Sequence, residues 1–350
     1  MGGQLHSIQI LRAAAAMAVV LFHLGDSLAR NFGLFPSNPF PAGSDGVDVF
    51  FVISGFIMCY TTAGVDQRSP ADFAMKRAAR IIPIYYLMTL VLFAVGLVMP
   101  SLLASGSATF EQLAKSLLFI PYERANGAVA PVLFLGWTLN YEMFFYAIFT
   151  IALIVAPRFR IQFVLAAMGA LTAVGWAAGS GGDLLVRFYT SGLLLEFVWG
   201  CLIFVVFNRY PSLIGHLKPL WVIGLAALLA QNFFDVPLPR EIEKGVPAAL
   251  IVLSFLGLRF QDGPARRAGA RLGDASYSLY LGHPYVIELV GKIAIAVLGA
   301  SIATGILTGI ISLAGSIGLA LLSFYLVERP SNAWLRKRAF ARPQKTVSNP

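Results

Sequence analysis

Residues 8–29 read IQILRAAAAMAVVLFHLGDSLA, a run that is apolar apart from a few polar side chains. A helix that crosses the hydrocarbon core of a bilayer needs about 20 predominantly apolar residues, so this stretch predicts a transmembrane helix. Arg12 and His23 lie inside it. An ionisable side chain near the bilayer centre costs at least about 2.5–3.5 kcal/mol, and it therefore faces the protein interior or a wet cavity. The stretch indicates both a membrane fold and a polar interior.

Similar apolar runs recur along the whole chain, which has 350 residues, 58% of them hydrophobic and only 12% charged. A soluble domain carries roughly 25% charged residues, so the composition predicts an all-α, polytopic integral membrane protein. The runs predict about ten spans, near 8–29, 47–63, 81–99, 134–156, 161–179, 188–207, 213–231, 245–258, 274–299 and 302–327. Those near 47–63 and 245–258 are short for a crossing.

The net charge of +9 reflects membrane topology and does not indicate nucleic-acid binding. Lysine and arginine concentrate in the connections after even-numbered spans and near the C-terminus, so the positive-inside rule predicts that both termini are cytoplasmic. We expect one transmembrane domain over residues 1–330 and a basic cytoplasmic tail over 331–350 that also touches anionic lipid. Cys59 and Cys201 lie inside expected spans and form no metal-type spacing, and we expect no metal.

Arg12 and His23 are eleven residues apart, which is about three helical turns, so both project from one helix face about 16 Å apart along the axis. A guanidinium binds phosphate or carboxylate as a bidentate donor, and imidazole suits proton transfer near neutral pH. One helix face can therefore serve both an anion and a proton transfer. The alternative is that Arg12 reaches the membrane interface and His23 bonds a neighbouring helix.

Two further stretches add charge at the ends of expected spans. Asp45 and Asp48 enter the second span at about the depth of His23, where a carboxylate could orient the histidine, or where Asp45 could cap a helix. Arg77 and Arg80 are three residues apart and share a helix face. This arginine pair is either an anion site or ordinary positive-inside anchoring.

The fourth and ninth spans also contain costly polar groups. Glu142 either binds substrate or steers a proton, or it forms a structural tie inside the bundle. His283 stands directly before Pro284, which frees a backbone carbonyl one turn earlier, and such breaks usually line a cavity. Three other ionisable residues we assign mainly to structure, with pairing expected between the last two: Glu196, Glu288 and Lys292.

Taken together, these stretches resemble the acyltransferase 3 family of membrane proteins, and within it the exopolysaccharide O-acetyltransferases of the succinoglycan type. The similarity covers nearly the whole chain, and the order and spacing of its motifs are specific. They are LR at 11–12 followed by His23, GVDVFFVISGF at 46–56, KRAARI at 76–81, GWTLNYEMFFY at 136–146, GDASYSLYLGHP at 273–284 and ERP at 328–330.

The resemblance implies that an acyl group, usually acetyl from cytoplasmic acetyl-CoA, is moved onto a carbohydrate hydroxyl. It implies His23 as the catalytic base with Arg12 as its motif partner, and Arg77 and Arg80 as contacts for coenzyme A. It also implies that Glu142 is an essential acidic residue. With Asp45 and Asp48 as catalytic candidates, we further expect substrate contacts from four residues in these motifs: Trp137, Asn140, Tyr280 and His283.

The expected setting is the bacterial cytoplasmic (inner) membrane, with a polysaccharide or lipid-linked oligosaccharide as acceptor. Some relatives carry a periplasmic hydrolase-like domain after the last span. Without one, transfer is expected to finish within the membrane domain or to pass the acyl group to another protein, such as a polysaccharide-assembly protein. The rival interpretation is a transporter or flippase of a lipid-linked sugar, since buried His and Glu with a broken span also suit a substrate pathway. A purely structural subunit would not need these polar groups.

Overall fold

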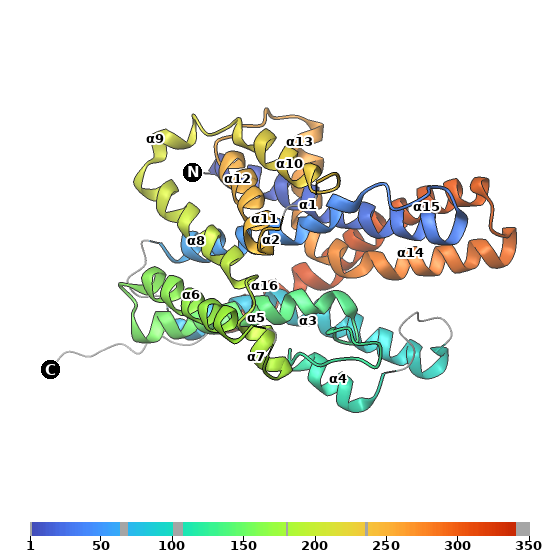
Figure 1. The fold of residues 1–350 in the computed structure, drawn as a ribbon, viewed down its shortest axis with the longest axis horizontal. Helices are drawn as coiled ribbons and strands as arrows, with labels where there is room; N and C mark the ends of the chain where they lie inside the picture. The colour runs from blue at the N-terminus through green and yellow to red at the C-terminus, as the bar shows by residue number, and fades with distance from the viewer. Residues whose placement is uncertain (1, 64–68, 101–107, 180, 235–236, 341–350) are drawn as a thin grey trace.

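The computed structural model describes residues 2–63, 69–100, 108–179, 181–234 and 237–340, and it shows a bundle of helices (Figure 1). Apart from one isolated bridge between Glu123 and Val129, the regular structure of these residues is helical. The all-α prediction is confirmed. Arg68 and residues 341–350, the second half of the expected tail, lie outside the described residues.

The helices follow one another in this order: α1 (Gly2–Phe32), η1 (Pro41–Asp45), α2 (Gly46–Thr62), α3 (Pro70–Val98), α4 (Phe110–Leu117), η3 (Phe134–Gly136), α5 (Trp137–Val155), α6 (Arg160–Ala178), α7 (Leu184–Tyr189), α8 (Leu194–Arg209), α9 (Pro211–Ile214), α10 (Leu220–Ala230), α11 (Arg240–Glu243), α12 (Gly245–Phe255), α13 (Pro264–Asp274), α14 (Ser276–Leu298), α15 (Ile302–Ser323), η4 (Phe324–Glu328) and α16 (Arg329–Phe340).

Eight helical segments among the described residues are long and apolar enough to cross a membrane, and they coincide with eight of the ten expected spans. They are His6–Phe32, Pro41–Thr62, Pro70–Val98, Phe134–Val155, Arg160–Ala178, Leu184–Arg209, Ser276–Leu298 and Ile302–Trp334. The polytopic membrane fold is therefore confirmed.

The remaining two expected spans, near 213–231 and 245–258, are shorter than a full crossing. Their helices α10 and α12 have 11 residues each, about 16 Å at 1.5 Å per residue, which is roughly half of a 30 Å hydrocarbon core. The two helices pack against each other, because Gly224 has no Cβ and lies close to the carbonyl oxygen of Pro247. Two half-length helices thus shield each other's backbone within the bundle.

Helix α1 is surrounded by other helices and contacts α2, α13, α14 and α15. Small residues permit this packing. A side chain at Gly43 or Gly46 would collide with the carbonyl oxygens of Ala18 and Ala15, and one at Gly273 would collide with that of Gln9. Close backbone approach at small residues is the usual way that membrane helices associate. The packing surrounds the polar residues of α1 with neighbouring helices.

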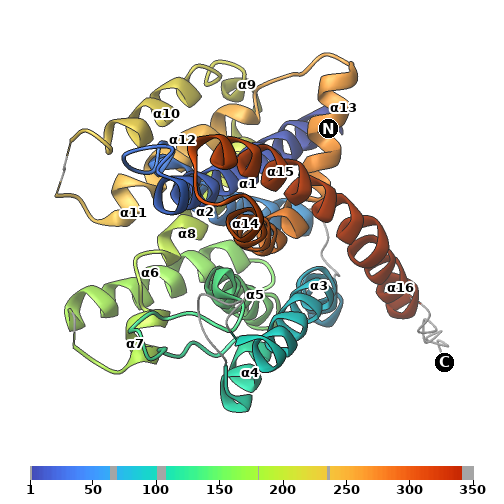
Figure 2. The same cartoon turned by 90° about the vertical axis from the view of Figure 1, so that its right-hand side faces the viewer.

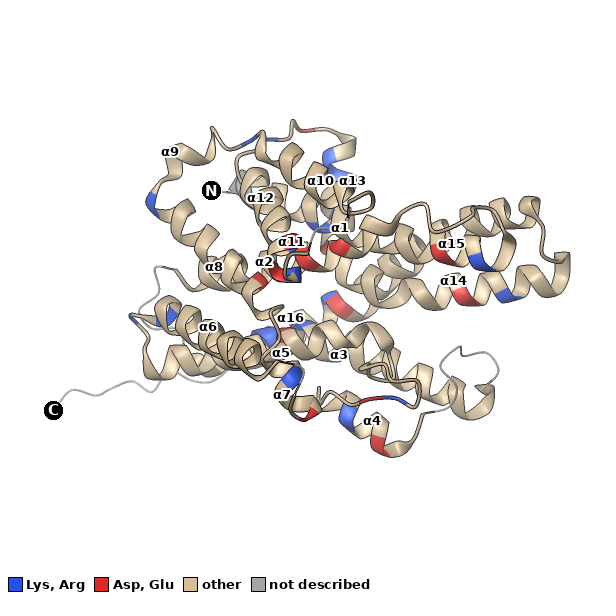
Figure 3. Ribbon diagram, in the orientation of Figure 1, with Lys and Arg blue, Asp and Glu red and all other residues tan. Residues whose placement is uncertain are grey.

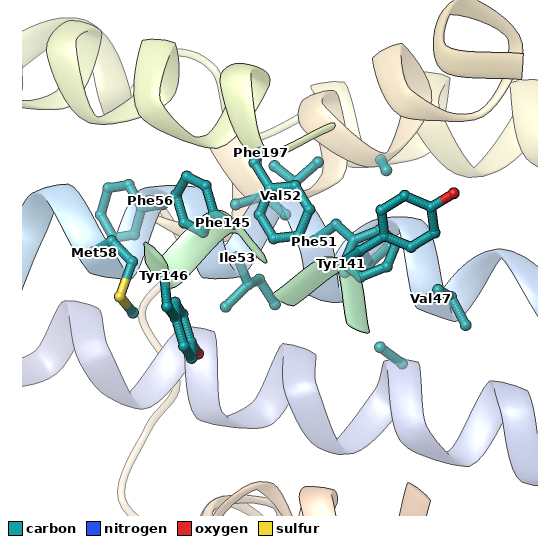
Figure 4. Close-up of a cluster of buried hydrophobic side chains, with 14 of the residues drawn as sticks. Val47, Phe51, Val52, Ile53, Phe56, Met58, Tyr141, Phe145, Tyr146 and Phe197 are labelled. Atoms are coloured by element: carbon teal, nitrogen blue, oxygen red, sulfur yellow. The ribbon is translucent and has the colours of Figure 1, made fainter. Parts of the chain in front are cut away.

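Helices α2 and α8 make a similar close contact at Gly55 and Gly200, where an added Cβ would meet backbone of the opposite helix. Beside this contact, the rings of Phe145 and Phe197 stack with centroids 4.5 Å apart, and Phe51 lies 4.8 Å from Phe197. Figure 4 shows these side chains converging from α2, α5 and α8. This aromatic core holds α2 and α5 in fixed relation, which matters because both helices supply site residues.

The last span continues without a break. Helix α15 passes through one π-helical turn, η4, into α16, which runs beside α3 (Figure 2). The expected tail from residue 331 therefore begins within a helix. The π-helical turn ends at Glu328, and such turns often occur at functional sites.

Candidate active site

Three arginines line a cavity of about 190 Å³ between the helices. Arg12 comes from α1, and Arg77 and Arg80 come from the start of α3, where their spacing of three residues places them on one face as predicted. The other charged residue of the lining is Glu142. The cavity therefore carries an excess of positive charge, and we call it the arginine cavity.

Arg12 is buried and Arg77 and Arg80 are partly exposed. Arg12 is 9% exposed and donates from Nη1 to Gln9 Oε1 at 3.0 Å. The Nε atom of Arg77 is buried without a hydrogen-bond partner among the described residues. A buried guanidinium is stable only when paired or hydrogen-bonded, and it prefers a phosphate or carboxylate that can accept two bonds. The arginine cavity is thus chemically suited to an anion.

Glu142 lies in the arginine cavity, and the described contacts do not place it beside His23. Its Oε1 atom accepts hydrogen bonds from the hydroxyl of Tyr146, one turn along α5, and from Ser54 Oγ of α2 at 3.2 Å. Its charge also acts on Arg77 and Arg12. Glu142 therefore ties α2 to α5, and it also lines the cavity.

Glu328 is a functional candidate that the sequence analysis missed. It is 4% exposed, accepts a hydrogen bond from Ser278 Oγ at 2.8 Å, and acts electrostatically on Arg80 and Arg12. It is the first residue of the ERP stretch, which was used only as a family motif. Its position as an acidic residue within an apolar span is the signal that could have identified it.

The two intramembrane histidines come together. The rings of His23 on α1 and His283 on α14 have centroids 5.2 Å apart and an interplanar angle of 37°. His23 is partly exposed and lies between Phe22 and Phe134, at 5.0 and 5.5 Å between ring centroids. His283 is fully buried. The spacing along the chain gave no sign of this contact, because the two residues lie at opposite ends of the sequence.

Tyr280 connects the histidine pair to the arginine cavity. It lines the cavity, and its ring centroid lies 6.4 Å from that of His283, one turn along α14. Its hydroxyl is 3.2 Å from Thr138 Oγ1, which also lines the cavity. Tyr280 of helix α14 therefore lies between the arginine cavity, which it lines, and the histidine pair, whose members are not part of the cavity lining.

Trp137 and Asn140, two of the expected substrate contacts, are not among the residues that line the arginine cavity. Trp137 packs edge-to-face on Phe51 and Tyr141, at 6.5 and 6.0 Å between centroids. Asn140 is 2% exposed, and its Oδ1 atom has no hydrogen-bond partner among the described residues. Of the four expected substrate contacts, Tyr280 lines the arginine cavity, whereas Trp137, Asn140 and His283 are not part of its lining.

Asp45 and Asp48 have ionic partners other than His23. Asp45 accepts from Lys244 at 2.6 Å and Asp48 accepts from Arg240 at 2.8 Å, so both carboxylates are tied to the segment formed by α11 and the start of α12. The expectation that one of them orients His23 is not supported by these contacts. The charges that act on His23 are those of Asp26 and Arg30, which pair with each other at 2.5 Å on α1.

The three residues that the sequence assigned mainly to structure, Glu196, Glu288 and Lys292, contact other ionisable side chains. Lys292 donates to Glu288 at 2.9 Å, as their spacing predicted. Glu196 is fully buried, and its carboxyl group adjoins that of Asp48. No group of three or more His, Cys, Asp and Glu side chains within the described part of the chain is arranged to hold a metal ion.

The sequence is similar to those of known proteins along nearly its whole length. Residues 5–325 match the family model described as an acyltransferase domain. The exopolysaccharide production protein ExoZ of Rhizobium meliloti is 35% identical, with 89% of this chain and 94% of that protein aligned. The peptidoglycan O-acetyltransferase OatA of Listeria monocytogenes is 25% identical over 95% of this chain but only 56% of its own length. The putative membrane-bound transacylase BcsY of Komagataeibacter xylinus is 26% identical over 91% of this chain and 81% of its own. No solved structure matches.

Proposed function

Since the chain belongs to the acyltransferase domain family, we propose that it transfers an acetyl group from cytoplasmic acetyl-CoA to a hydroxyl of an exopolysaccharide or of its lipid-linked sugar precursor. The observation that supports this proposal is a cationic cavity lined by Tyr280, with a histidine pair on the other side of that residue. O-acetylation from acetyl-CoA needs a site for the phosphates of the donor and an acceptor for the proton of the hydroxyl. The name of ExoZ supports exopolysaccharide as the acceptor class.

Arg12, Arg77 and Arg80 are proposed to hold the phosphates of coenzyme A. Each guanidinium can form charge-assisted hydrogen bonds to phosphate oxygens, and three of them line one cavity with a single carboxylate. Coenzyme A is a phosphate-rich donor, so binding neutralises the excess charge of the cavity. Glu142, held by Tyr146 and Ser54, keeps the guanidinium groups of the cavity in place.

His23 is proposed to act as the general base. Its ring takes the proton of the sugar hydroxyl while the oxygen attacks the thioester carbonyl carbon. The carbon–sulfur bond then breaks, and the coenzyme A thiolate leaves with the proton that the imidazolium returns. A positioned general base contributes about 10²–10⁴-fold to rate. Trp137, Asn140 and Tyr280 remain proposed contacts for the acceptor, while Asp45 and Asp48 are left out of the proton transfer because of their ionic partners.

The proposed setting is the inner membrane of a bacterium, where the cytoplasmic side supplies acetyl-CoA and the acceptor is membrane-associated. Residues 1–330 are proposed to form the catalytic unit and 331–350 a basic cytoplasmic segment. Polysaccharide-assembly proteins are proposed partners, since the acceptor is made by such a system.

The test uses the purified protein with radiolabelled acetyl-CoA and de-O-acetylated exopolysaccharide. We expect labelled ester in the polysaccharide, and a loss of about 10²–10⁴-fold in His23→Ala and His23→Gln at equal membrane abundance. His216→Ala is the matched control, because His216 is exposed and lies outside the site. Acetylation that persists in both His23 variants would exclude His23 as the base. If the wild type forms no product but moves lipid-linked sugar across the membrane of vesicles, the protein would instead be a transporter or flippase of that sugar.

A further inference from the structure

The hydrogen bonding of His283 determines which of its ring nitrogens carries the proton. Nδ1 lies 3.0 Å from the carbonyl oxygen of Leu279, and a carbonyl oxygen can only accept. The neighbouring carbonyl of Tyr280 also acts on the ring, and it lacks its helical partner because Pro284 has no N–H. Nδ1 is therefore the donor, and in the neutral ring Nε2 holds the lone pair.

That lone pair has no hydrogen-bond partner among the described residues, although His283 is fully buried. A buried polar atom left without a partner is uncommon and calls for an explanation. The polar rings that border His283 are those of Tyr280 and His23. The Tyr280 hydroxyl already meets Thr138. His23 is the remaining polar ring among these contacts. The two rings are not hydrogen-bonded in this structure, but a centroid separation of 5.2 Å is short enough for a ring rotation to bring two nitrogens to about 3 Å.

His23 in turn lacks a dedicated carboxylate. Glu142 is bonded by Tyr146 and Ser54, and Asp26, one turn along α1, is paired with Arg30. An imidazole that accepts a proton on one nitrogen needs an acceptor for the N–H on the other, which fixes the tautomer and stabilises the imidazolium. Among the described contacts of His23, the unpartnered Nε2 of His283 is the acceptor suited to this task.

We propose that His283 is a positioning residue for the acyl transfer, with its Nε2 accepting the second N–H of His23. The proton from the sugar hydroxyl enters on the other nitrogen of His23 and leaves with the thiolate, while the N–H that faces His283 is never transferred. A neutral imidazole thus takes the place that a carboxylate holds in a catalytic triad. This inference rests on the proposed function and replaces the substrate contact expected for His283.

Two amide variants distinguish positioning from packing. In His283→Gln an amide oxygen reaches the position of Nε2, whereas His283→Asn reaches only the position of Nδ1 and keeps a donor for Leu279. We expect the Asn variant to lose roughly 10²-fold in kcat, within the range for general base catalysis, with KM for acetyl-CoA unchanged. The Gln variant should recover about 10-fold of that loss. Combined with His23→Ala, the Asn variant should cause no additional loss, because residues that act as a unit are not additive.

The measurements are initial rates with radiolabelled acetyl-CoA and de-O-acetylated exopolysaccharide, normalised to monodisperse protein on size-exclusion chromatography. His216→Asn is the control. Four outcomes would each overturn the positioning role of His283 while leaving the proposed function intact. They are a wild-type kcat in His283→Asn, equal losses in the Asn and Gln variants, a rise in KM alone, and an additive loss in the double variant. A wild-type protein that forms no acetyl ester would instead overturn the proposed function itself.

Discussion

The arginine cavity and a second buried group of charges differ in how their charges are balanced. The second group, which we call the acidic cluster, consists of Asp45, Asp48 and Glu196 with Arg240 and Lys244. Figure 3 shows acidic and basic segments meeting where α2 lies beside α11. The cavity has three arginines and one glutamate on its lining, whereas the acidic cluster has more carboxylates than bases.

This difference separates a proposed binding site from a structural tie. Guanidinium groups that outnumber the carboxylates on a cavity lining are only partly balanced, so a bound anion would balance their remaining charge. Asp45 and Asp48 of the acidic cluster are already paired with Lys244 and Arg240, and these pairs join the start of α2 to the segment 240–244. We therefore expect mutation of a charged residue to affect mainly ligand binding in the arginine cavity and mainly stability in the acidic cluster.

The largest effect is expected when the arginine cavity loses its excess charge. The double variant Arg77→Ala with Arg80→Ala should weaken acetyl-CoA binding by roughly 10²-fold or more, because each charge-assisted hydrogen bond contributes about 1.5–3 kcal/mol and 1.4 kcal/mol is tenfold in affinity. Equilibrium binding of labelled acetyl-CoA to detergent-solubilised protein measures it. Arg266→Ala with Arg267→Ala on α13 is the matched control. Unchanged acetyl-CoA binding in the Arg77 and Arg80 variant would mean that these residues serve only to set the membrane topology.

Much of the membrane fold could be predicted from the sequence, because a bilayer imposes length and apolarity on each span separately. Eight of the expected spans appear as full helices. The shared face of Arg77 and Arg80 and the pairing of Glu288 with Lys292 follow from helical spacing alone. The short span expected near 245–258 agrees with the half-length helix α12, whereas the half-length of α10 could not be predicted, because it depends on packing against α12.

Contacts between distant spans could not be predicted either. His23 and His283 meet because α1 and α14 pack side by side, and Asp48 bonds Arg240 across a separation of 192 residues. Helical periodicity says which face a residue occupies but not which helix covers that face. For this reason the sequence identified most polar residues of the candidate site but could not give the ionic partners of Asp45 and Asp48.

An intermediate effect is expected from breaking the acidic cluster at its main ion pair. Asp48→Asn removes the charge that binds Arg240, and it should lower stability by about 1–2 kcal/mol. This is less than the 3–5 kcal/mol typical of fully buried pairs, because the Arg240 side chain is 42% exposed and can turn to water. Thermal unfolding in detergent, with a double-mutant cycle against Arg240→Gln, measures the loss. We expect kcat to stay within about twofold, so a collapse of kcat at normal stability would contradict a purely structural role.

The smallest effect, with the opposite sign, is expected for Glu196→Gln. Glu196 is fully buried, and its carboxyl group adjoins that of Asp48, whose carboxylate already binds Arg240. Two adjoining buried carboxyl groups do not both ionise, so we expect Glu196 to carry the proton and donate it to Asp48. A glutamine of the same shape keeps a donor for Asp48 and needs no proton uptake on folding at neutral pH. Stability should therefore rise by about 0–1 kcal/mol, the range of a net hydrogen bond, with wild-type acetyl transfer. Glu196→Ala is the control for shape and should destabilise through the cavity it leaves. If the Gln variant is destabilised as much as Asp48→Asn, then Glu196 contributes a negative charge that stabilises the acidic cluster. The contrast between the arginine cavity and the acidic cluster is then weaker than their geometry implies.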